Sequence, residues 1–496
     1  MLRVDQVRDP ETLRQMAILL ERENQRLHER IKKLTEEISR LRGEDNGRLQ
    51  QELEFLKELL SRREQELFGE SSEKRSVPER DAQGSPNGVQ RGHGPKAQPE
   101  LPIREQIHDL DEADRICPAC GGELKEMGQF EDSEEITVVE RRFVLVKHRR
   151  KKYRCQCNGC VETALGPPKL KPGARYSPEF AVEVVIGKYL DHLPLERQVR
   201  IMAREGLRVD SQTLWDQTET VAHLLERSGE ALFNGVLASD LVHADESWWR
   251  LMERRGAKRW WAWSVGTEEA VSYRILDSRS QDAARKVLGD YRGIVMADGY
   301  GAYGALSRDG PGFVLAHCWA HVRRKFVEIE EHYPEPCREI LDLIGKLYEV
   351  EREAALAGDG EQVRARRAEL RPERSRPIVA EIQRWALAQR VLPESSLGKA
   401  IAYMLGIWKG LTLFLDDARV PLDNNLAERG LRGLVLGRKN YYGSRSKRGT
   451  EVAALFYSLI ESAKLVGVDP KAYLLKAVHA AIAVPKTVTL PRDLLG

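Results

Sequence analysis

Three acidic residues, widely separated in the sequence, occupy settings in which a carboxylate can do chemistry. Asp245 lies inside the apolar and aromatic run LVHADESWWRLME, where an unpaired buried carboxylate costs several kcal/mol. Asp298 ends the apolar run GIVMAD, and the strand ends of α/β units are where functional groups are presented. Glu428 lies in DNNLAERGLR, where Asn425, Glu428 and Arg432 recur on one helical face. We therefore interpret Asp245, Asp298 and Glu428 as one candidate acid cluster.

The chemistry expected of such a cluster is metal-dependent phosphoryl transfer. Carboxylate oxygens are the ligands that Mg²⁺ and Mn²⁺ prefer, and two such ions about 3.5–4 Å apart can activate a nucleophile and stabilise a leaving oxygen. Glu246 cannot share the site with Asp245, because neighbouring residues of a strand point to opposite faces. Two alternatives concern Glu428: Asp423 is a competing third ligand, and a solvated helix with ion pairs would need no chemistry.

The elements that must position these acids begin near residue 236. Three β-type runs, LVHADESWWRLME, KRWWAWSVG and AVSYRILDS, are separated by short polar or glycine-containing breaks and predict three antiparallel strands. The helical stretch SQDAARKVLGDY and the apolar strand that ends at Asp298 follow. This β-β-β-α-β order is how a ribonuclease H-like mixed sheet begins. In that sheet the first and fourth strands are neighbours, which would bring Asp245 and Asp298 together.

A second site is indicated by the cysteines, five of which lie between positions 117 and 160. The pairs Cys117-x-x-Cys120 and Cys157-x-x-Cys160, with β-type runs between them, have the layout of a zinc ribbon that holds one structural Zn²⁺. Cys155 could replace Cys157 as the third ligand. Buried or incidental cysteines are the alternative. Cys318 and His321 also have metal-like spacing, but two ligands do not make a zinc site, and core packing of Cys318, Trp319 and His321 is the favoured interpretation.

Local clusters of basic residues suggest contacts with DNA phosphates, although solvated charge would explain them too. The segment LPLERQVRIMAREGLRVDSQTLW predicts a helix, a turn at Gly206 and a second helix capped by Asp210 or Ser211, which are helix-turn-helix proportions. The basic residues that we expect to contact DNA are Arg149, Arg150, Lys151, Lys152, Arg323, Arg324, Lys325, Arg432, Arg438 and Lys439.

The N-terminal region has the heptad spacing of a leucine zipper. The β-branched residues at the a positions, with Leu at d, favour a parallel two-stranded coil, so we expect a homodimer. A single amphipathic helix packed on its own domain is the alternative. The residues expected to form the dimer interface are Leu13, Leu20, Asn24, Leu27, Ile31, Leu34, Ile38 and Leu41.

Composition adds two limits. The 79 Lys and Arg residues nearly balance the 77 Asp and Glu residues, so the net charge of +2 gives no global sign of a polyanionic partner. No apolar run of about 18 residues and no secretory h-region is visible, which predicts a cytoplasmic protein, associated with the nucleoid when bound to DNA.

These patterns predict a multidomain α/β chain. The expected divisions are a coiled coil at 11–68, a flexible linker at 69–104, a zinc-binding ribbon at 105–170, a helical, helix-turn-helix-like DNA-binding region at 171–235, a ribonuclease H-like catalytic core at 236–450 with a helical insertion at about 331–415, and C-terminal helices at 451–496.

In combination, the motifs resemble those of the insertion sequence 66 family of transposases. The matching segments, in chain order, are ELFGESSEK, CPACGG, LPLERQ, HADES, ADGYGAY, HCWAHVRRKF and DNNLAERGLRGLVLGRKN. The resemblance implies a DDE triad on a ribonuclease H-like core, at Asp245, Asp298 and Glu428. It also implies cleavage at transposon ends, transfer of the freed 3′-hydroxyl to target DNA, and companion proteins from the same element. Ser247 stands where the family usually has Thr.

Two other classes of protein would share some of these features. A ribonuclease H-like nuclease, such as a resolvase, would use similar acids but has less need of a zipper and a large insertion. A non-enzymatic, zinc-containing dimeric DNA-binding regulator would account for the N-terminal half, but it leaves residues 236–449 unexplained.

Overall fold

The computed structural model describes residues 26–35, 50–61, 143–154, 161–253, 256–309 and 312–495. Several predictions concern residues outside these ranges. They are the linker at 69–104, the zipper positions Leu13, Leu20, Asn24, Ile38 and Leu41, and the cysteines Cys117, Cys120, Cys155, Cys157 and Cys160.

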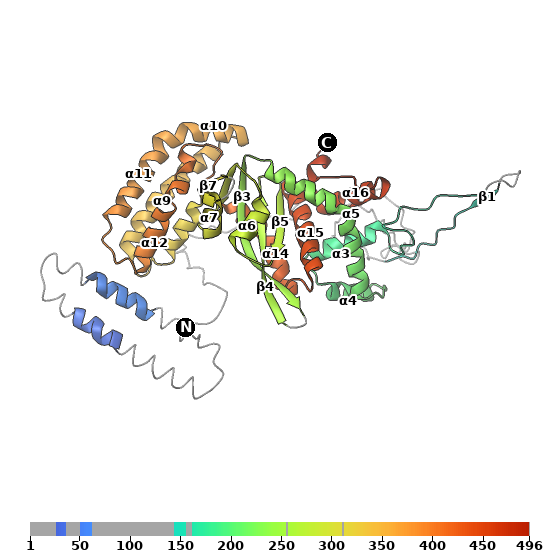
Figure 1. Ribbon diagram of the computed structural model, residues 1–496, viewed down its shortest axis with the longest axis horizontal. Helices are drawn as coiled ribbons and strands as arrows, with labels where there is room; N and C mark the ends of the chain where they lie inside the picture. Colours follow the sequence, from blue (N-terminus) through green and yellow to red (C-terminus); the bar gives the residue numbers. More distant parts are fainter. Residues whose placement is uncertain are drawn as a thin grey trace, which may run out of the picture. The chain divides into compact units, whose positions relative to one another are not determined.

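A five-stranded mixed sheet organises the described part of the chain (Figure 1). Its strands are β3 (Leu241–Glu253), β4 (Gly256–Gly266), β5 (Val271–Leu276), β6 (Ile294–Ala297) and β7 (Val314–His317). The order across the sheet is β5-β4-β3-β6-β7, in which β3, β4 and β5 are antiparallel neighbours and β3, β6 and β7 run parallel. The predicted antiparallel trio and the predicted pairing of the first strand with the fourth are therefore confirmed.

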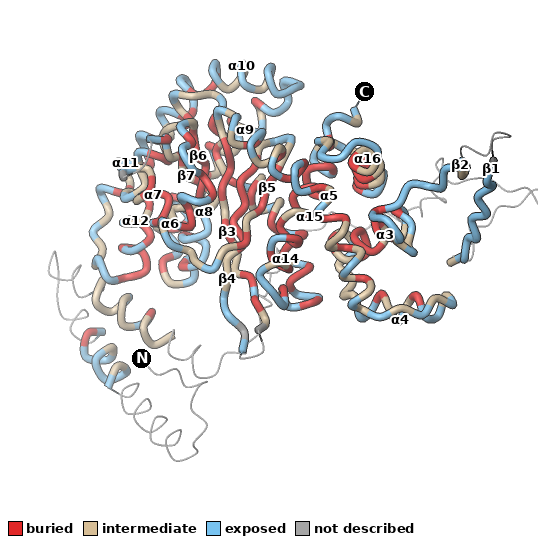
Figure 2. The backbone as a smooth tube through the Cα atoms, turned by 45° about the vertical axis from the view of Figure 1, so that its right-hand side comes forward, coloured by how far each residue is buried: buried red, intermediate tan, exposed pale blue. Residues whose placement is uncertain are grey.

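Successive side chains of β3 point to opposite faces of the sheet and pack in two different hydrophobic cores. Val242 and Ala244 pack with helices α6 (Gln281–Leu288) and α7 (Gly301–Asp309). Trp249, of the opposite parity, packs on the other face with α5 (Ser211–Leu237), α14 (Asn425–Tyr441) and α15 (Lys447–Leu465). In Figure 2 the strands are largely coloured as buried, because helices cover both faces. Polar side chains on β3 therefore need specific partners.

A helical segment separates α8 (Trp319–Val327) from α14. Its elements are α9 (Pro334–Ala355), α10 (Gly360–Leu370), the π-helix η3 (Arg371–Ser375), α11 (Arg376–Ala388), α12 (Ser396–Gly406), α13 (Trp408–Leu411) and the 3₁₀ helix η4 (Leu413–Leu415). Arg371, only 1% exposed, donates to Glu351 Oε1 at 2.8 Å and to the carbonyls of Phe414 and Val420 at 2.8 and 3.0 Å. This buried guanidinium fixes the chain just before it enters α14.

The helices before the sheet are α3 (Pro178–Tyr189), α4 (Leu195–Arg204) and α5. As predicted, the chain turns at Gly206, where φ is +87°, and Asp210 caps α5 by accepting from the backbone N–H of Thr213. Helix α5 continues far beyond a recognition helix, because Val221 and Leu225 are buried in the same core as the sheet and α15. The predicted boundary between 235 and 236 therefore does not separate two hydrophobic cores.

Two further helices end the chain, α16 (Pro470–Ala483) and the 3₁₀ helix η5 (Pro491–Leu494). A short hairpin of β1 (Lys152–Arg154) and β2 (Val161–Thr163) precedes α3. Residues 26–35 and 50–61 are helical, Leu34 is fully buried, and Arg30 pairs with Glu52 at 3.0 Å. The zipper dimer stays a prediction. None of the helices in the described ranges is both long enough and apolar enough to cross a membrane.

Candidate active site

Asp245 and Asp298 lie at equivalent positions of two neighbouring parallel strands. Strand β3 pairs with β6 in the register His243 to Met296, and Asp245 and Asp298 each follow two residues later. Residues two apart on a strand share a face, and neighbouring strands are about 4.8 Å apart. The two carboxylates therefore occupy the same face, at the point where β6 ends and β3 continues.

Asn424 attaches the start of α14 to the strand that carries Asp245. Its side chain is fully buried, and its Nδ2 donates to the carbonyl of Ala244 at 2.8 Å. Its Oδ1 lies 2.9 Å from His243 Nδ1, which must donate because an amide oxygen can only accept. The backbone N–H of Asn424 donates to Cys318 Sγ at 3.1 Å. The first turn of α14 is thus held between β3 and the start of α8.

Glu428 lies in that first turn and is delivered to the same face of the sheet. Both of its carboxylate oxygens lie 3.3 Å from Nη2 of Arg324, and Oε1 lies 3.5 Å from Nε2 of His321. Both partners come from α8, which starts directly after β7. Asp423, the competing third ligand, instead accepts from the backbone and side chain of Asn425 at 3.1 and 2.7 Å.

Burial and neighbouring carboxylates act on the pKa of Asp245. Burial raises the pKa of Asp245 to about 7, and the negative charges of Glu246, Asp298 and Glu428 act in the same direction, opposed by the backbone N–H of Glu246. Burial lowers the pKa of His321, although the negative charges of Asp298 and Glu428 act to raise it. Among the residues that the structure describes, the charges that act on the Asp245 pKa most strongly are therefore negative.

Such a donor set is suited to Mg²⁺ or Mn²⁺, because it offers hard carboxylate oxygens whose mutual repulsion a divalent cation would relieve. In the present conformation, however, no three carboxylate, imidazole or thiol groups of the described residues are close enough together to hold a metal ion. The contacts of Glu428 give the physical reason, since its oxygens are directed to Arg324 and His321.

Glu246 points to the opposite face, as the alternation of the strand predicted. Its side chain is 1% exposed, and its Oε1 accepts from Nε of Arg279 at 2.8 Å and from Nη2 of the same guanidinium. Its Oε2 accepts from the hydroxyl of Tyr303 at 2.8 Å. Sequence reasoning did not identify Arg279, Tyr303 or the anchoring role of Asn424. Only the buried, charged setting of HADES hinted that a partner for Glu246 had to exist.

The basic residues predicted to contact DNA differ in their exposure to solvent. Arg149, Arg150, Lys151 and Lys152 are exposed at or just before β1, and Arg323, Arg324, Lys325, Arg432 and Lys439 are exposed on α8 and α14. Arg438 is 7% exposed, stacks 3.7 Å from the ring centre of Trp248, and donates to Ser247 Oγ at 3.0 Å. Arg438 is therefore corrected from a DNA contact to a buried residue that fastens α14 to β3. The Ser247 hydroxyl provides the acceptor.

The packing interpretation of the HCWAH segment fits two of its three residues. Trp319 is fully buried and donates to the carbonyl of Leu411 at 2.9 Å. Cys318 is 1% exposed, its Sγ accepts from the backbone N–H of Asn424, and burial raises the pKa of its thiol to about 11. His321 differs, because its imidazole faces Glu428.

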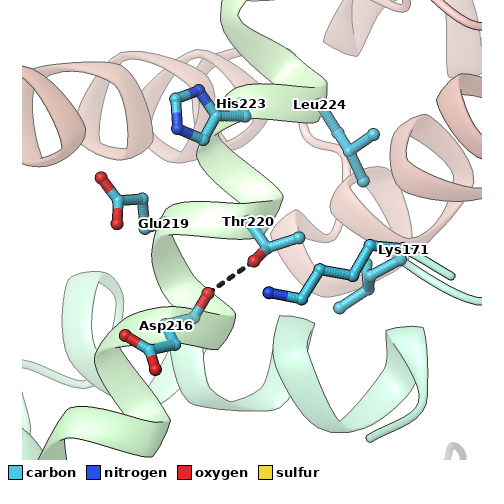
Figure 3. Close-up of a pocket in the computed structure, with 7 residues that line it drawn as sticks. Lys171, Asp216, Glu219, Thr220, His223 and Leu224 are labelled. Carbon is cyan, nitrogen blue, oxygen red and sulfur yellow. Dashed lines mark hydrogen bonds between the residues drawn. The ribbon is translucent and has the colours of Figure 1, made fainter. Parts of the chain in front are cut away.

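A pocket of about 420 Å³ lies elsewhere, along α5 (Figure 3). It is lined by Leu170, Lys171, Asp216, Glu219, Thr220, His223 and Leu224 and contains none of the predicted catalytic acids. Figure 3 shows Asp216, Glu219 and His223 projecting from one side of α5 and Lys171, from the segment before α3, on the other side, and the Thr220 hydroxyl donates to the Asp216 carbonyl at 2.6 Å.

Comparison with known proteins identifies the family. The model described as "Transposase IS66 family" matches residues 173–452, and that of the "zinc-finger binding domain of transposase IS66" matches residues 114–158. The chain is 31% identical to the uncharacterized protein y4jD of Sinorhizobium fredii (strain NBRC 101917 / NGR234) over 408 residues, 78% of each chain. It is 27% identical to the uncharacterized protein y4hP of the same organism over 475 residues, 90% of this chain and 84% of that protein. The first of these family models spans more than half of the 496 residues, and this protein belongs to the IS66 family of transposases.

Proposed function

We propose that this chain is a DNA transposase of the DDE type, which cleaves phosphodiesters at transposon ends and transfers the freed 3′-hydroxyl to target DNA. The observation that carries the proposal is the placement of Asp245 and Asp298 at equivalent positions of adjacent parallel strands, with Glu428 brought to the same face by Asn424. The strand order β5-β4-β3-β6-β7 supports a ribonuclease H-like core. A regulator without catalytic activity would not need these acids.

In the proposed site, Asp245, Asp298 and Glu428 hold the divalent cations. When bound, Mg²⁺ or Mn²⁺ lowers the pKa of the attacking water or 3′-hydroxyl and stabilises the leaving oxygen. Asn424 fixes the distance between β3 and α14. In the metal-free protein, Arg324 pairs with Glu428. When Glu428 binds a metal ion instead, the guanidinium of Arg324 becomes available to bind a DNA phosphate.

DNA binding is distributed over several elements in this proposal. The exposed basic residues of the β1 region, α8 and α14 contact phosphates, and the α4–α5 pair provides a further contact. The zinc finger carries structural Zn²⁺, in line with the match to residues 114–158. That range contains Cys117, Cys120, Cys155 and Cys157 and ends before Cys160. Cys155 is therefore a candidate zinc ligand alongside the cysteines of the two C-x-x-C pairs.

The assembly and location follow the same logic. We propose a homodimer formed through the N-terminal heptads, acting in the cytoplasm on the nucleoid, with companion proteins of the same element. Size-exclusion chromatography with light scattering tests the dimer: a Leu20→Asp, Leu27→Asp double variant is expected to be monomeric, whereas a dimer unaffected by these changes would contradict the zipper.

The enzymatic proposal is tested with a labelled duplex that carries the element's own end. The full chain is expected to nick this duplex at the element boundary and to join the labelled strand to a target plasmid in Mg²⁺, and to do neither in EDTA. A duplex with a scrambled end serves as the control. Cleavage that is independent of the end sequence, without joining, would favour a ribonuclease H-like nuclease over a transposase.

A further inference from the structure

A buried ion pair lies on the face of the sheet opposite the three acids, and none of the roles above involves it. Glu246 of β3 is enclosed beneath α7, where Tyr303 donates to one of its oxygens and Arg279 donates twice to the other. Arg279 belongs to the loop between β5 and α6, immediately before the Ser280 N-cap. The chain therefore folds back over the sheet to bring this guanidinium to Glu246.

The guanidinium of Arg279 is held in one orientation by more than its ion pair. Its plane lies 3.6 Å from the ring centre of Tyr300 and 4.9 Å from that of Trp261. The hydroxyl of Tyr300 in turn donates to the backbone carbonyl of Arg279 at 2.5 Å. The carboxylate, the aromatic rings and the backbone together restrict the conformations of this arginine side chain before any ligand is present. Binding a ligand therefore costs less conformational entropy than it does for a free arginine side chain.

Arg279 is also close to the catalytic acids, although it approaches them from the other face. The backbone N–H of Tyr300, on which Arg279 stacks, donates to Asp298 Oδ1 at 3.0 Å. Partial burial acts to lower the pKa of Arg279, but its hydrogen bonds to Glu246 and the negative charges of Glu246 and Asp298 outweigh this and raise it. The side chain is nevertheless 33% exposed, so part of it reaches solvent.

An ion pair that only stabilised the fold would not need this exposed edge, the aromatic stacking or the position beside Asp298. Arginine presents a planar fork of donors that matches the oxygens of a phosphate, and it can keep one edge on a carboxylate while it offers another. A DNA strand whose scissile bond lies at Asp245 and Asp298 must pass over the end of β6. There its next phosphate would meet the exposed part of Arg279.

We propose that Arg279 is a phosphate-binding residue of the active site, held in place by Glu246, Tyr300 and Tyr303. Its ligand is a phosphodiester of the DNA strand that flanks the scissile bond. The inference rests on the proposed transposase function for the identity of the strand. Glu246 is then a positioning residue, and the second acid of HADES has a different role from the first.

The test measures binding and cleavage separately, with a fluorescein-labelled duplex of the element's own end. Binding is followed by anisotropy in Ca²⁺ over a range of salt concentrations, and cleavage is followed in Mg²⁺. For Arg279→Gln we expect the slope of log K against log salt to fall by about 0.9, the value for one lost phosphate contact. Cleavage should fall on the order of 10²-fold. Arg285→Gln, an exposed arginine on α6, should change neither.

A double variant separates phosphate binding from a merely structural role. Glu246→Gln combined with Arg279→Gln removes both charges, so no uncompensated buried carboxylate remains. If Arg279 binds phosphate, the double variant stays as impaired as Arg279→Gln. Recovery of the wild-type slope and cleavage rate in the double variant would overturn the proposal, as would an Arg279→Gln slope equal to that of Arg285→Gln.

Arg279→Lys covers the case in which the glutamine variants do not fold. It keeps the charge, so the salt slope should persist, but the ammonium lacks the planar fork, and cleavage should fall at least roughly tenfold. Wild-type cleavage by this variant would refute the proposal. The salt slope needs no catalysis, so a wild type that binds the duplex but never cleaves it would contradict the proposed function while the role of Arg279 is still measured.

Discussion

Replacing Asn424 with alanine should damage both stability and catalysis, because this side chain joins the two parts of the acid site. Asn424 is fully buried and partners the carbonyl of Ala244 and the Nδ1–H of His243. Alanine would leave both groups buried without partners. At about 1–3 kcal/mol for each orphaned group, the free energy of unfolding should fall by about 2–6 kcal/mol.

The catalytic effect follows from geometry. Without Asn424, the start of α14 is no longer tied to β3, and a displacement of Glu428 by about 1 Å can cost roughly 10²-fold in rate. Urea denaturation measures the stability change, and cleavage of the end duplex measures the rate. Asn425→Ala is the matched control, since Asn425 is exposed and its side chain donates to the neighbouring Asp423.

The result that would refute this reasoning is an Asn424→Ala protein with the wild-type urea midpoint and cleavage rate. Should alanine prevent folding, Asn424→Asp provides a second test. Aspartate keeps the shape and the acceptor but loses the donor to Ala244 and adds a carboxylate near Asp245. Its destabilisation should exceed that of Asn425→Asp and should grow as the pH rises and the new carboxylate ionises.

Four further predictions concern other parts of the fold and site. Gly437→Ala should be destabilising in thermal denaturation because its Cβ would lie 1.8 Å from the Tyr457 hydroxyl, whereas Gly345→Ala, with no atom within 4 Å, should be neutral or stabilise by up to about 1 kcal/mol; equal effects would contradict the packing of α14 on α15. Arg371→Ala should cost about 3–5 kcal/mol in urea denaturation because it leaves the buried carbonyls of Phe414 and Val420 without a donor and removes one of the two arginines that pair with Glu351, whereas Arg374→Ala, which breaks an exposed pair, should leave the urea midpoint close to that of the wild type. Arg324→Gln should tighten Mn²⁺ binding to the DNA-free protein in calorimetry, since Glu428 loses a competitor for its oxygens; unchanged affinity would show that Arg324 does not compete. Finally, burial raises the pKa of Asp245 in the folded protein to about 7, from 3.8 for an unperturbed aspartate, so the metal-free folded protein holds this proton more tightly than the unfolded chain and loses the associated stability as the pH rises between these values; Asp245→Asn should flatten that part of the stability profile, and an unchanged profile would contradict the assignment.

The strands could be predicted from the sequence because their signals are local. Alternation and β-branched or aromatic residues mark β3, β4 and β5, and a short apolar run marks β6. Asp245 and Asp298 could be placed because each is a carboxylate in or directly after such a run. The order of the elements along the chain predicted that these two strands are adjacent in the sheet, and the observed pairing of β3 with β6 agrees with that prediction.

The contacts that complete the site could not be predicted, because they join residues far apart in the chain. Asn424 is 180 residues from Ala244, and Arg279 is 33 residues from Glu246. A pattern within one segment does not encode such partners. The sequence indicated only that a partner was needed, since a buried glutamate in an apolar strand requires a counter-charge.

Which basic residues face solvent could not be predicted, for a related reason. Arg438 and Lys439 are adjacent in LGRKN, yet Arg438 is buried over Trp248 and Lys439 is exposed. Arginine can stack on an aromatic ring and still satisfy its donors, so a basic cluster does not reveal which members face solvent. Which basic residues are buried depends on which face of α14 packs against β3, and that packing is a property of the tertiary structure.

The central claim, that Asp245, Asp298 and Glu428 form one catalytic site, is tested most directly by single and double substitutions in one cleavage assay with Mg²⁺. Asp245→Asn, Asp298→Asn and Glu428→Gln should each abolish cleavage and strand transfer, and pairs of them should be no worse than the singles, because residues acting as one unit are not additive. Glu331→Gln, an exposed carboxylate just after α8, should cleave like the wild type. Full activity in any of the three single variants would contradict the assignment.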